Sequence, residues 1–199
     1  MNYRKVSPLA MITLAFALPA LQGCTGLLVG GTAAGALAVA EERSVGTVID
    51  DTTIRIQVNN QLFQADYDLF AAVSVDVFEG QVLLTGHVKR PEDRVEAVRL
   101  AWQASGVKNV INEIQVTDKG GVANYLRDVW ISTRLRSKLL FDREIVSINY
   151  NVETVNGVVY LIGIAQSQDE LERVTNHART VRHVNKVVSH VRVKNAQAG

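Results

Sequence analysis

Residues 73–88 read VSVDVFEGQVLLTGHV, and residues 150–165 repeat the pattern as YNVETVNGVVYLIGIA. In the first stretch apolar and polar residues alternate up to a Glu-Gly pair, and a second apolar run begins directly after it. Alternation with period two is typical of a half-buried strand, and a short glycine-containing turn between two such runs predicts a tight β-hairpin. We therefore expect Gly80 and Gly157 to be structural glycines of two hairpin turns.

These two stretches belong to a longer internal repeat. Shifting the chain by 77 residues aligns 50–116 with 127–193 without a gap. The identical pairs include Asp51/Asp128, Ile54/Ile131, Leu62/Leu139, Val75/Val152, Gly80/Gly157, Val82/Val159, Leu84/Leu161, Gly86/Gly163, Ala101/Ala178, Val107/Val184, Val110/Val187 and Val116/Val193. The repeat predicts two domains, over residues 46–117 and 124–194, with Gly86 and Gly163 as further structural glycines.

Each copy has the predicted element order αββαβ. Ile54, Val58 and Leu62 recur every fourth residue, which indicates one apolar helix face. Pro91 and the acidic pair after it favour the start of a second helix, and residues 110–116 form the predicted closing strand. The expected fold class is α+β, with two helices packed on a three-stranded mixed sheet in each copy.

The N-terminus has the pattern of a secretory signal peptide over residues 1–23. Arg4 and Lys5 precede an apolar stretch at 9–20, which is shorter than the roughly 20 residues that a membrane-spanning helix needs. Leu-Gln-Gly-Cys at 21–24 resembles the lipobox of bacterial lipoproteins. That resemblance implies cleavage before Cys24 and acylation of this residue, palmitate included; an ordinary signal peptide that happens to contain a cysteine is the alternative.

The residue after Cys24 is Thr25 rather than the aspartate that resembles an inner-membrane retention signal, so the resemblance implies the outer membrane. Residues 24–45 are the expected acylated tether. Their Gly/Ala-rich run at 26–40 contains small-xxx-small spacings, which favour helix packing in a membrane, but the run is short and only weakly hydrophobic. We therefore interpret it as a flexible or interfacial tether rather than a second span.

Composition excludes several classes of function. The chain holds 21 basic and 20 acidic side chains, net +1, which is not the strongly basic footprint of a nucleic-acid-binding protein. Its single cysteine excludes an internal disulfide and any multi-cysteine metal site. Nucleotide-binding and nucleophile motifs do not occur, and Asp51 and Asp128 fit helix capping better than acid catalysis. We expect no enzyme activity, no cofactor and no metal.

The αββαβ order, the repeated glycines, and Val-Lys-Asn-Val at 107–110 with Val-Asn-Lys-Val at 184–187 resemble the BON domain. Two such domains behind a lipobox resemble the dual BON-domain outer-membrane lipoproteins. The resemblance implies a lipid-anchored outer-membrane protein that faces the periplasm. It further implies binding of anionic phospholipid through the second domain and support of envelope integrity, with cell-division sites as one place of action.

The second copy differs from the first mainly in charge and in one helix face. Residues 50–116 carry net charge −4, whereas residues 127–193 carry +3. At 100° per residue, an outward stripe of the helix near 126–141 combines aromatic, basic and polar residues where the first copy has polar ones. The candidate phospholipid-binding residues are Leu126, Arg127, Trp130, Arg134, Ser137, Lys138 and Phe141, and the polar equivalents in the first copy are Thr53, Gln57, Asn60 and Gln64.

Aromatic and cationic side chains on one helix face suit a membrane interface, where the rings lie at headgroup depth and the cations meet phosphates. Each cation near an anionic leaflet contributes about 1 kcal/mol, so Arg127, Arg134, Arg136 and Lys138 together contribute roughly 4 kcal/mol. Other interpretations place Trp130 against the first domain, or Phe141 folded back into the core. The alternative function is a non-enzymatic protein-protein adaptor for envelope or division proteins.

Overall fold

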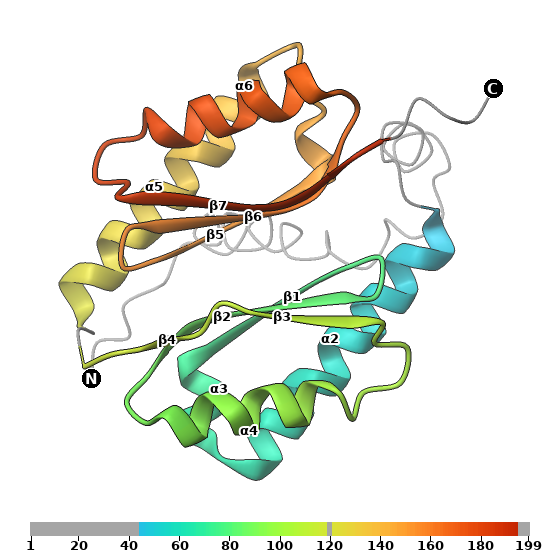
Figure 1. Ribbon diagram of the computed structural model, residues 1–199, viewed down its shortest axis with the longest axis vertical. Coiled ribbons are helices and arrows are strands. Elements are labelled where there is room, and N and C mark those ends of the chain that lie inside the picture. The colour runs from blue at the N-terminus through green and yellow to red at the C-terminus, as the bar shows by residue number, and fades with distance from the viewer. Residues whose placement is uncertain (1–43, 119–120, 195–199) are drawn as a thin grey trace, which may run out of the picture. The chain divides into compact units, whose positions relative to one another are not determined.

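The computed structural model of the chain describes residues 44–118 and 121–194 (Figure 1). The predicted signal peptide, Cys24 and all of the predicted tether except its last two residues lie outside the described residues. Within them both copies fold as α+β units, and the predicted fold class is confirmed.

The first copy begins with a long helix that Ser44 caps: its Oγ accepts a hydrogen bond from the backbone N–H of Thr47 at 3.1 Å. Ile54, Val58 and Leu62 are buried on one side of this helix, as their spacing predicts. The elements of this copy are α2 (Val45–Ala65), α3 (Tyr67–Ala72), β1 (Val73–Phe78), β2 (Gln81–Val88), α4 (Pro91–Ala101), β3 (Asn109–Asn112) and β4 (Gln115–Val116).

The second copy repeats this order with small changes. Its elements are α5 (Val122–Phe141), the 3-10 helix η2 (Ser147–Asn149), β5 (Tyr150–Val155), β6 (Val158–Ala165), α6 (Gln168–Arg179) and β7 (Lys186–Val193). Strands β5 and β6 pair antiparallel, and β7 pairs parallel with β6 because helix α6 carries the chain back across the sheet. The same mixed order, β1-β2-β3, is found in the first copy.

Two features of the first copy depart from the sequence prediction. A short helix, α3, follows α2, because Asp66 leaves the helical conformation and its side chain accepts hydrogen bonds from Asp68 and Leu69 N–H groups. The predicted closing strand 110–116 is interrupted: β3 and β4 both pair with β2, but Ile114 between them is buried rather than paired in the ladder.

The repeated aspartates have a different role from the predicted helix cap. Helix α2 begins at Val45, so Asp51 lies inside it, and its buried carboxylate accepts the N–H groups of Glu79 and Gly80 at 2.8 Å each. Asp128 binds the hairpin turn of the second copy in the same way. Each aspartate thus fixes its hairpin to its first helix, and the carboxylate serves the backbone rather than chemistry.

The repeated glycines lie where a side chain does not fit. Gly80 and Gly157 have φ of +79° and +76°, as the second residue of a tight hairpin turn requires. At Gly163, φ is +155° and an added Cβ would lie 2.0 Å from the carbonyl oxygen of Asn149. Gly86 has the same constraint, with a Cβ 2.1 Å from the oxygen of Ala72. In each copy the second strand of the hairpin thus passes very close to the backbone of the residue that precedes the first strand.

The helices lie on one face of each sheet, and the opposite faces of the two sheets pack together (Figure 1). Each copy has its own core between helices and sheet. A third apolar cluster joins the two copies, and its buried members are Phe78, Leu83, Val155, Tyr160, Ile162 and Ile164. Because this cluster draws on β1, β2, β5 and β6, the second face of each sheet is buried as well.

Polar contacts around this cluster obey the symmetry of the repeat. Arg192 donates to Glu79 at 2.8 Å, and the equivalent pair in the other copy, Asn156 and Gln115, is joined at 2.9 Å. Near the middle, His190 Nε2 and Glu113 Oε1, which occupy equivalent positions, lie 2.9 Å apart. The copies therefore pack as a pseudo-twofold pair, while the side chains at equivalent positions have diverged into complementary partners.

Candidate functional site

Helix α5 carries the predicted lipid-binding residues on the side that faces away from the core. Ile131, Leu135 and Leu139 are buried beneath it, within 2% exposure. The opposite side holds large apolar side chains in contact with solvent: Leu126 is 59% and Phe141 83% exposed. A folded domain seldom leaves a cluster of large apolar side chains in contact with solvent, and such a cluster marks an interaction site.

Trp130 is 46% exposed and meets His183 of its own copy edge-on, with ring centroids 6.1 Å apart. The interpretation that Trp130 packs on the first copy is therefore not supported by its ring contact. Phe141 is the last residue of α5, and the extended conformation of Asp142 ends the helix there. Its 83% exposure contradicts the interpretation that Phe141 folds back into the core.

The predicted basic residues of α5 do not all point to solvent in the same manner. Arg134 is exposed, whereas Lys138 is half-buried and donates from Nζ to Thr180 Oγ1 at 3.0 Å. Arg127 is exposed and donates to Asn124 at 3.3 Å, and Ser137 donates to the carbonyl oxygen of Thr133 at 3.0 Å. Arg127 and Arg134 are thus the exposed cations of this set, whereas Ser137 and Lys138 are half-buried.

Arg136 corrects the charge estimate made from sequence. Its side chain is 56% exposed, but its guanidinium donates to the carbonyl oxygen of Val152 and lies 3.8 Å from the carboxylate of Glu153, so its charge already has partners at the sheet. At about 1 kcal/mol per cation, the remaining Arg127, Arg134 and Lys138 contribute roughly 3 kcal/mol toward an anionic surface.

A hollow of about 630 Å³ brings four of the predicted residues together at the C-terminal end of α5. It is lined by Arg134, Ser137, Lys138, Phe141, Asp142, Arg143 and His177. Leu126, Arg127 and Trp130 do not line it, since they lie earlier along the helix; Leu126 and Phe141 are roughly 20 Å apart at 1.5 Å per residue. The predicted residues thus form a cationic hollow at one end and an apolar and aromatic region at the other.

The one acid of this hollow is paired. Asp142 lies 2.7 Å from His177 Nε2, and it also accepts the N–H of Glu144 at 3.0 Å. The hydrogen bond from His177, followed by that from the backbone, holds the pKa of Asp142 below its usual value. Arg134, Lys138 and Arg143 therefore face the hollow as cations beside an acid that already has a partner.

Sequence reasoning missed several apolar residues of the same surface. They are Val122, Tyr125, Val129 and Leu140, which are between 44% and 76% exposed. The missed signal was the angular width of the stripe: these residues lie within about 100° of Leu126 on the helix wheel, so a wider sector would have included them. Arg143 was missed because it follows the helix, where helical spacing no longer applies.

The first helix of the other copy is not polar throughout. Thr53, Asn60 and Gln64 are exposed as expected, and Gln57 is half-buried, where its Oε1 accepts the N–H of Ser105 at 2.9 Å. A neighbouring line of α2, however, exposes large apolar side chains, namely Val45, Ile49, Ile56 and Phe63. The sequence comparison was correct at the four aligned positions but wrong for the helix face as a whole.

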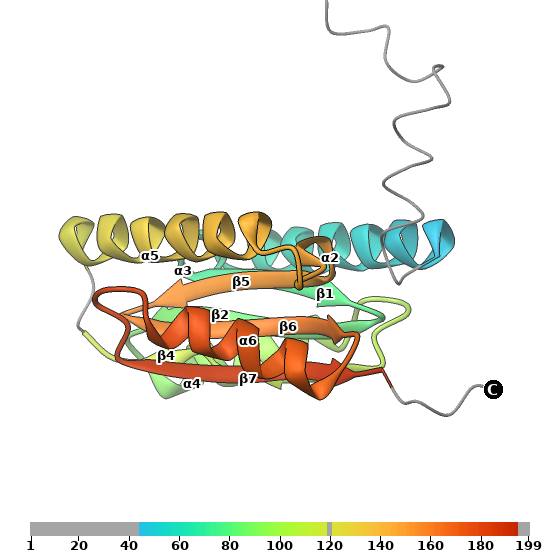
Figure 2. The same ribbon diagram turned by 90° about the horizontal axis from the view of Figure 1, so that it is seen from above.

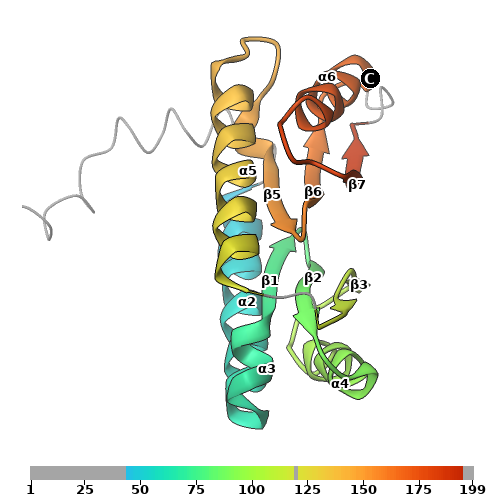
Figure 3. The same cartoon turned by 90° about the vertical axis from the view of Figure 1, so that its left-hand side faces the viewer.

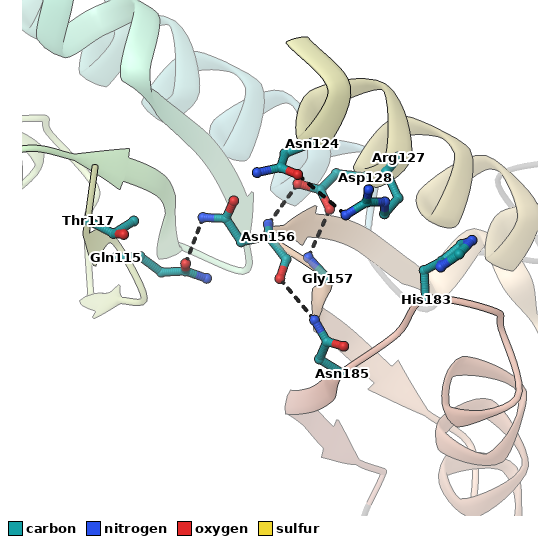
Figure 4. Close-up of a pocket in the computed structure, with 9 residues that line it drawn as sticks. All are labelled: Gln115, Thr117, Asn124, Arg127, Asp128, Asn156, Gly157, His183 and Asn185. Carbon is teal, nitrogen blue, oxygen red and sulfur yellow. Dashed lines mark hydrogen bonds between the residues drawn. The ribbon is translucent and has the colours of Figure 1, made fainter. Parts of the chain in front are cut away.

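Arg127 also lines a smaller polar hollow of about 280 Å³ where the two copies meet (Figure 4). Figure 4 shows that its polar groups bind one another: Asp128 accepts the backbone N–H groups of Asn156 and Gly157, and the side-chain amide of Asn156 donates to Gln115. A hollow whose polar groups bind each other in this way serves the packing of the two copies.

A pair of acidic side chains lies at the same boundary. Asp76 and Glu153 occupy equivalent positions; Arg55 lies 3.4 Å from Asp76, and Asn151 donates to it at 3.5 Å. Burial, then the charge of Asp76, raises the pKa of Glu153 to about 7. Burial likewise raises the pKa of Asp76, against the opposing effect of Arg55 and Arg136.

In the part of the chain that the structure describes, none of the helices is long and apolar enough to cross a membrane. Across residues 44–118 and 121–194 there is also no group of three His, Cys, Asp or Glu side chains placed to hold a metal ion.

Comparison with known proteins agrees with the repeat. The family model of the BON domain matches residues 50–118 and 127–195, more than half of the chain. A protein encoded in the gshII 5' region of Anaplasma centrale is 44% identical over 75% of this chain and 98% of its own length. The outer membrane lipoprotein DolP of Haemophilus influenzae is 34% identical over 74% of this chain and 78% of its own, and the 21 kDa hemolysin of Actinobacillus pleuropneumoniae is 36% identical over 74% and 76%.

Proposed function

This chain belongs to the BON-domain family and is an envelope-associated protein of DolP type, and from that premise we propose that it binds anionic phospholipids through α5. It acts without enzyme chemistry, as a lipid-anchored protein of the outer membrane that faces the periplasm. Supporting envelope integrity, also at division sites, is its role in the cell. Cys24 carries the acyl anchor, and the surface of α5 is the second, selective contact with the bilayer.

The observation that carries this proposal is the outward surface of α5. Three cations, Arg134, Lys138 and Arg143, surround a hollow into which Phe141 also faces. Exposed Leu126 and Trp130 extend the apolar surface along the helix. Phosphate groups suit the guanidinium and ammonium groups, while the apolar side chains suit the region below the headgroups.

Energies indicate how anchor and surface act together. The roughly 3 kcal/mol from the α5 cations alone corresponds to a dissociation constant above millimolar, so charge does not hold a free protein on a vesicle without the apolar contact of the exposed Leu126, Trp130 and Phe141. A chain anchored by acylation keeps α5 within a short distance of the bilayer, and the effective concentration of the surface then makes weak contacts sufficient. The anchor supplies residence on the membrane, and α5 supplies the preference for anionic lipid.

The test is flotation of the mature chain, residues 24–199 with Cys24→Ser, on vesicles of phosphatidylethanolamine with phosphatidylglycerol. Trp130→Ala together with Arg134→Glu is expected to weaken binding roughly a hundredfold, because it removes an aromatic anchor and reverses one charge. Binding of the parent chain is expected to fall as salt rises.

A matched control is available in the first copy. Trp102 is 50% exposed and Arg94 is exposed on α4, so Trp102→Ala with Arg94→Glu makes the same chemical change away from α5. This control is expected to bind as the parent does. Equal binding by the α5 variant and the parent would contradict the proposal. Absence of vesicle binding by the parent would favour the protein-protein adaptor instead.

A further inference from the structure

Helix α2 exposes an apolar line of its own, which we call the α2 stripe: Val45, Ile49, Ile56, Phe63, and Tyr67 at the start of α3. Each of these side chains is between 54% and 66% exposed. The spacings of four and seven residues keep them on one side of the helix, opposite the buried Ile54, Val58 and Leu62. The surface is continued by Phe70, whose ring lies 5.4 Å from that of Phe63.

The α2 stripe lacks charge. Helix α2 contains only Asp50, Asp51 and Arg55 as charged residues; Asp51 binds the hairpin turn, and Arg55 faces Asp76. Asp50 follows Ile49 directly and so lies about 100° round the helix from it. Between the apolar residues the outward face carries threonine and asparagine. This face offers no charged group to a protein partner that binds through charge. The apolar region just below the lipid headgroups, in contrast, accommodates such a face.

Helices α2 and α5 lie on the same side of the packed sheets, as both Figure 2 and Figure 3 show. The end of α3, which follows α2, and the first half of α5 border one hollow of about 450 Å³, which is lined by Ala71 and Ala72 and by Val122, Tyr125 and Val129. Helices α2 and α5, rather than α4 and α6, therefore form this side of the molecule.

The position of the anchor favours the same occupant. Helix α2 begins at Val45, about 20 residues after Cys24, so a fully extended connection reaches at most roughly 75 Å. Val45, the first residue of the α2 stripe, is also the first residue of α2 and lies at the end of the expected tether. Of the two long helices, α2 is the one that lies nearer in sequence to the acylated Cys24.

We propose that the α2 stripe inserts into the same lipid leaflet as α5, so that the membrane-binding face is built from both copies. This inference rests on the proposed function of α5. The two helices make different contacts with lipid. Helix α5 contributes phosphate contacts and hence lipid selectivity, and α2 contributes apolar contact that is independent of headgroup charge. The pseudo-twofold pairing of the copies is what places both helices on one leaflet.

The first test compares vesicle binding of the mature Cys24→Ser chain with that of the Ile49→Gln, Ile56→Gln double variant. Affinity is expected to fall roughly tenfold or more, to the same extent at low and high salt, because apolar contact is not screened. Val95→Gln is the matched control: Val95 is 68% exposed on α4, which lies on the other side of the sheets (Figure 2). A double variant that binds as tightly as the parent overturns the inference.

The second test locates the α2 stripe directly. A single cysteine at Ile56, at Leu126 or at Arg94 in the Cys24→Ser chain carries a fluorophore, and brominated lipids in phosphatidylglycerol vesicles act as quencher. Quenching at Ile56 and Leu126 but not at Arg94 is expected. Quenching at Leu126 alone overturns this inference and leaves the function of α5 standing, whereas quenching at neither overturns both.

A protein occupant would give a different result. If the α2 stripe joined two copies of the chain, the parent would sediment as a dimer without lipid and the Ile49→Gln, Ile56→Gln variant as a monomer. That outcome overturns the inference, and a monomeric parent with lipid-quenched Ile56 supports it.

Discussion

Helices α2 and α5 occupy equivalent positions in the two copies and bury the same three core positions. Their outer surfaces share exposed apolar side chains at three pairs of equivalent positions, namely Val45/Val122, Ile49/Leu126 and Phe63/Leu140, but they differ in charge. On α5, Arg127, Arg134 and Lys138 accompany the exposed apolar residues. On α2 the outward face between the exposed apolar residues carries threonine and asparagine instead of cations. Packing against the sheet constrains one side of each helix, and the other side is free to diverge. Differences between the copies therefore report on what each surface contacts.

The largest expected effect tests how equivalent the two copies are. Gly163→Val places a Cβ 2.0 Å from the Asn149 oxygen at a φ that valine avoids, and Gly86→Val makes the same clash with Ala72. Each substitution is expected to cost about 3 kcal/mol or more of folding free energy, measured by urea unfolding. Gly46→Ala is the control, since its added Cβ meets nothing closer than 3.7 Å. Stability unchanged in either valine variant would contradict the close approach.

A smaller effect on folding stability is expected at Glu153, which lies with Asp76 at the boundary between the copies. The pKa of Glu153 is raised to about 7 from an ordinary value of 4.5, so the folded state binds its proton more tightly than the unfolded state does. The stability associated with Glu153 is then fully present below pH 4.5 and is lost as pH rises through about 7. Glu153→Gln is expected to be about 1 kcal/mol more stable than the parent at pH 8, with a smaller gain at pH 5.

Thermal unfolding at the two pH values measures this effect. Glu92→Gln, at an exposed position in the first turn of α4, is the control and is expected to show no such pH-dependent gain. A Glu153→Gln variant that is less stable than the parent at pH 8 would show that the ion pair with Arg136 outweighs burial.

The smallest effect sharpens the contrast between the helices by transferring the chemistry of α5 to α2. Thr53→Trp with Asn60→Arg changes two exposed positions, of which Thr53 aligns with Trp130. The added cation is expected to strengthen binding to phosphatidylglycerol vesicles by about 1 kcal/mol, roughly fivefold, and to make the contribution of α2 dependent on salt. Thr53→Trp with Asn60→Gln, which adds no charge, separates the two contributions. A gain that ignores salt would argue against the electrostatic basis of α5.

Much of the architecture could be predicted because it depends on local patterns. The hairpin turn at Gly80, the apolar spacing of Ile54, Val58 and Leu62, and the proline start of α4 each act over a few residues. The break at Ile114 could not be predicted, because an apolar residue reads alike whether it pairs in a strand or fills the core between strands.

The candidate site was predicted in part. Helical spacing found Trp130, Arg134 and Phe141 on one outward sector, since spacing alone determines which residues share a face. It could not find Arg143, which joins the hollow only because the chain turns after α5. It also counted Arg136 as an unpaired cation, because sequence does not say that Glu153 and the Val152 carbonyl lie within its reach.

The sequence by itself determined the repeat, the α+β order of each copy, and the residues that distinguish α5 from α2. These follow from periodicity, from glycine's backbone freedom and from alignment of the chain with itself. Only the tertiary structure decided that Asp51 and Asp128 hold hairpins, that Asp76 and Glu153 meet at one boundary, and that α2 and α5 lie on one side. The physical reason is that each of these is a contact between residues far apart in sequence, which no local pattern encodes. The aspartates depend on how a helix packs against the hairpin of its own copy, and the other two features depend on how the second faces of the two sheets pack.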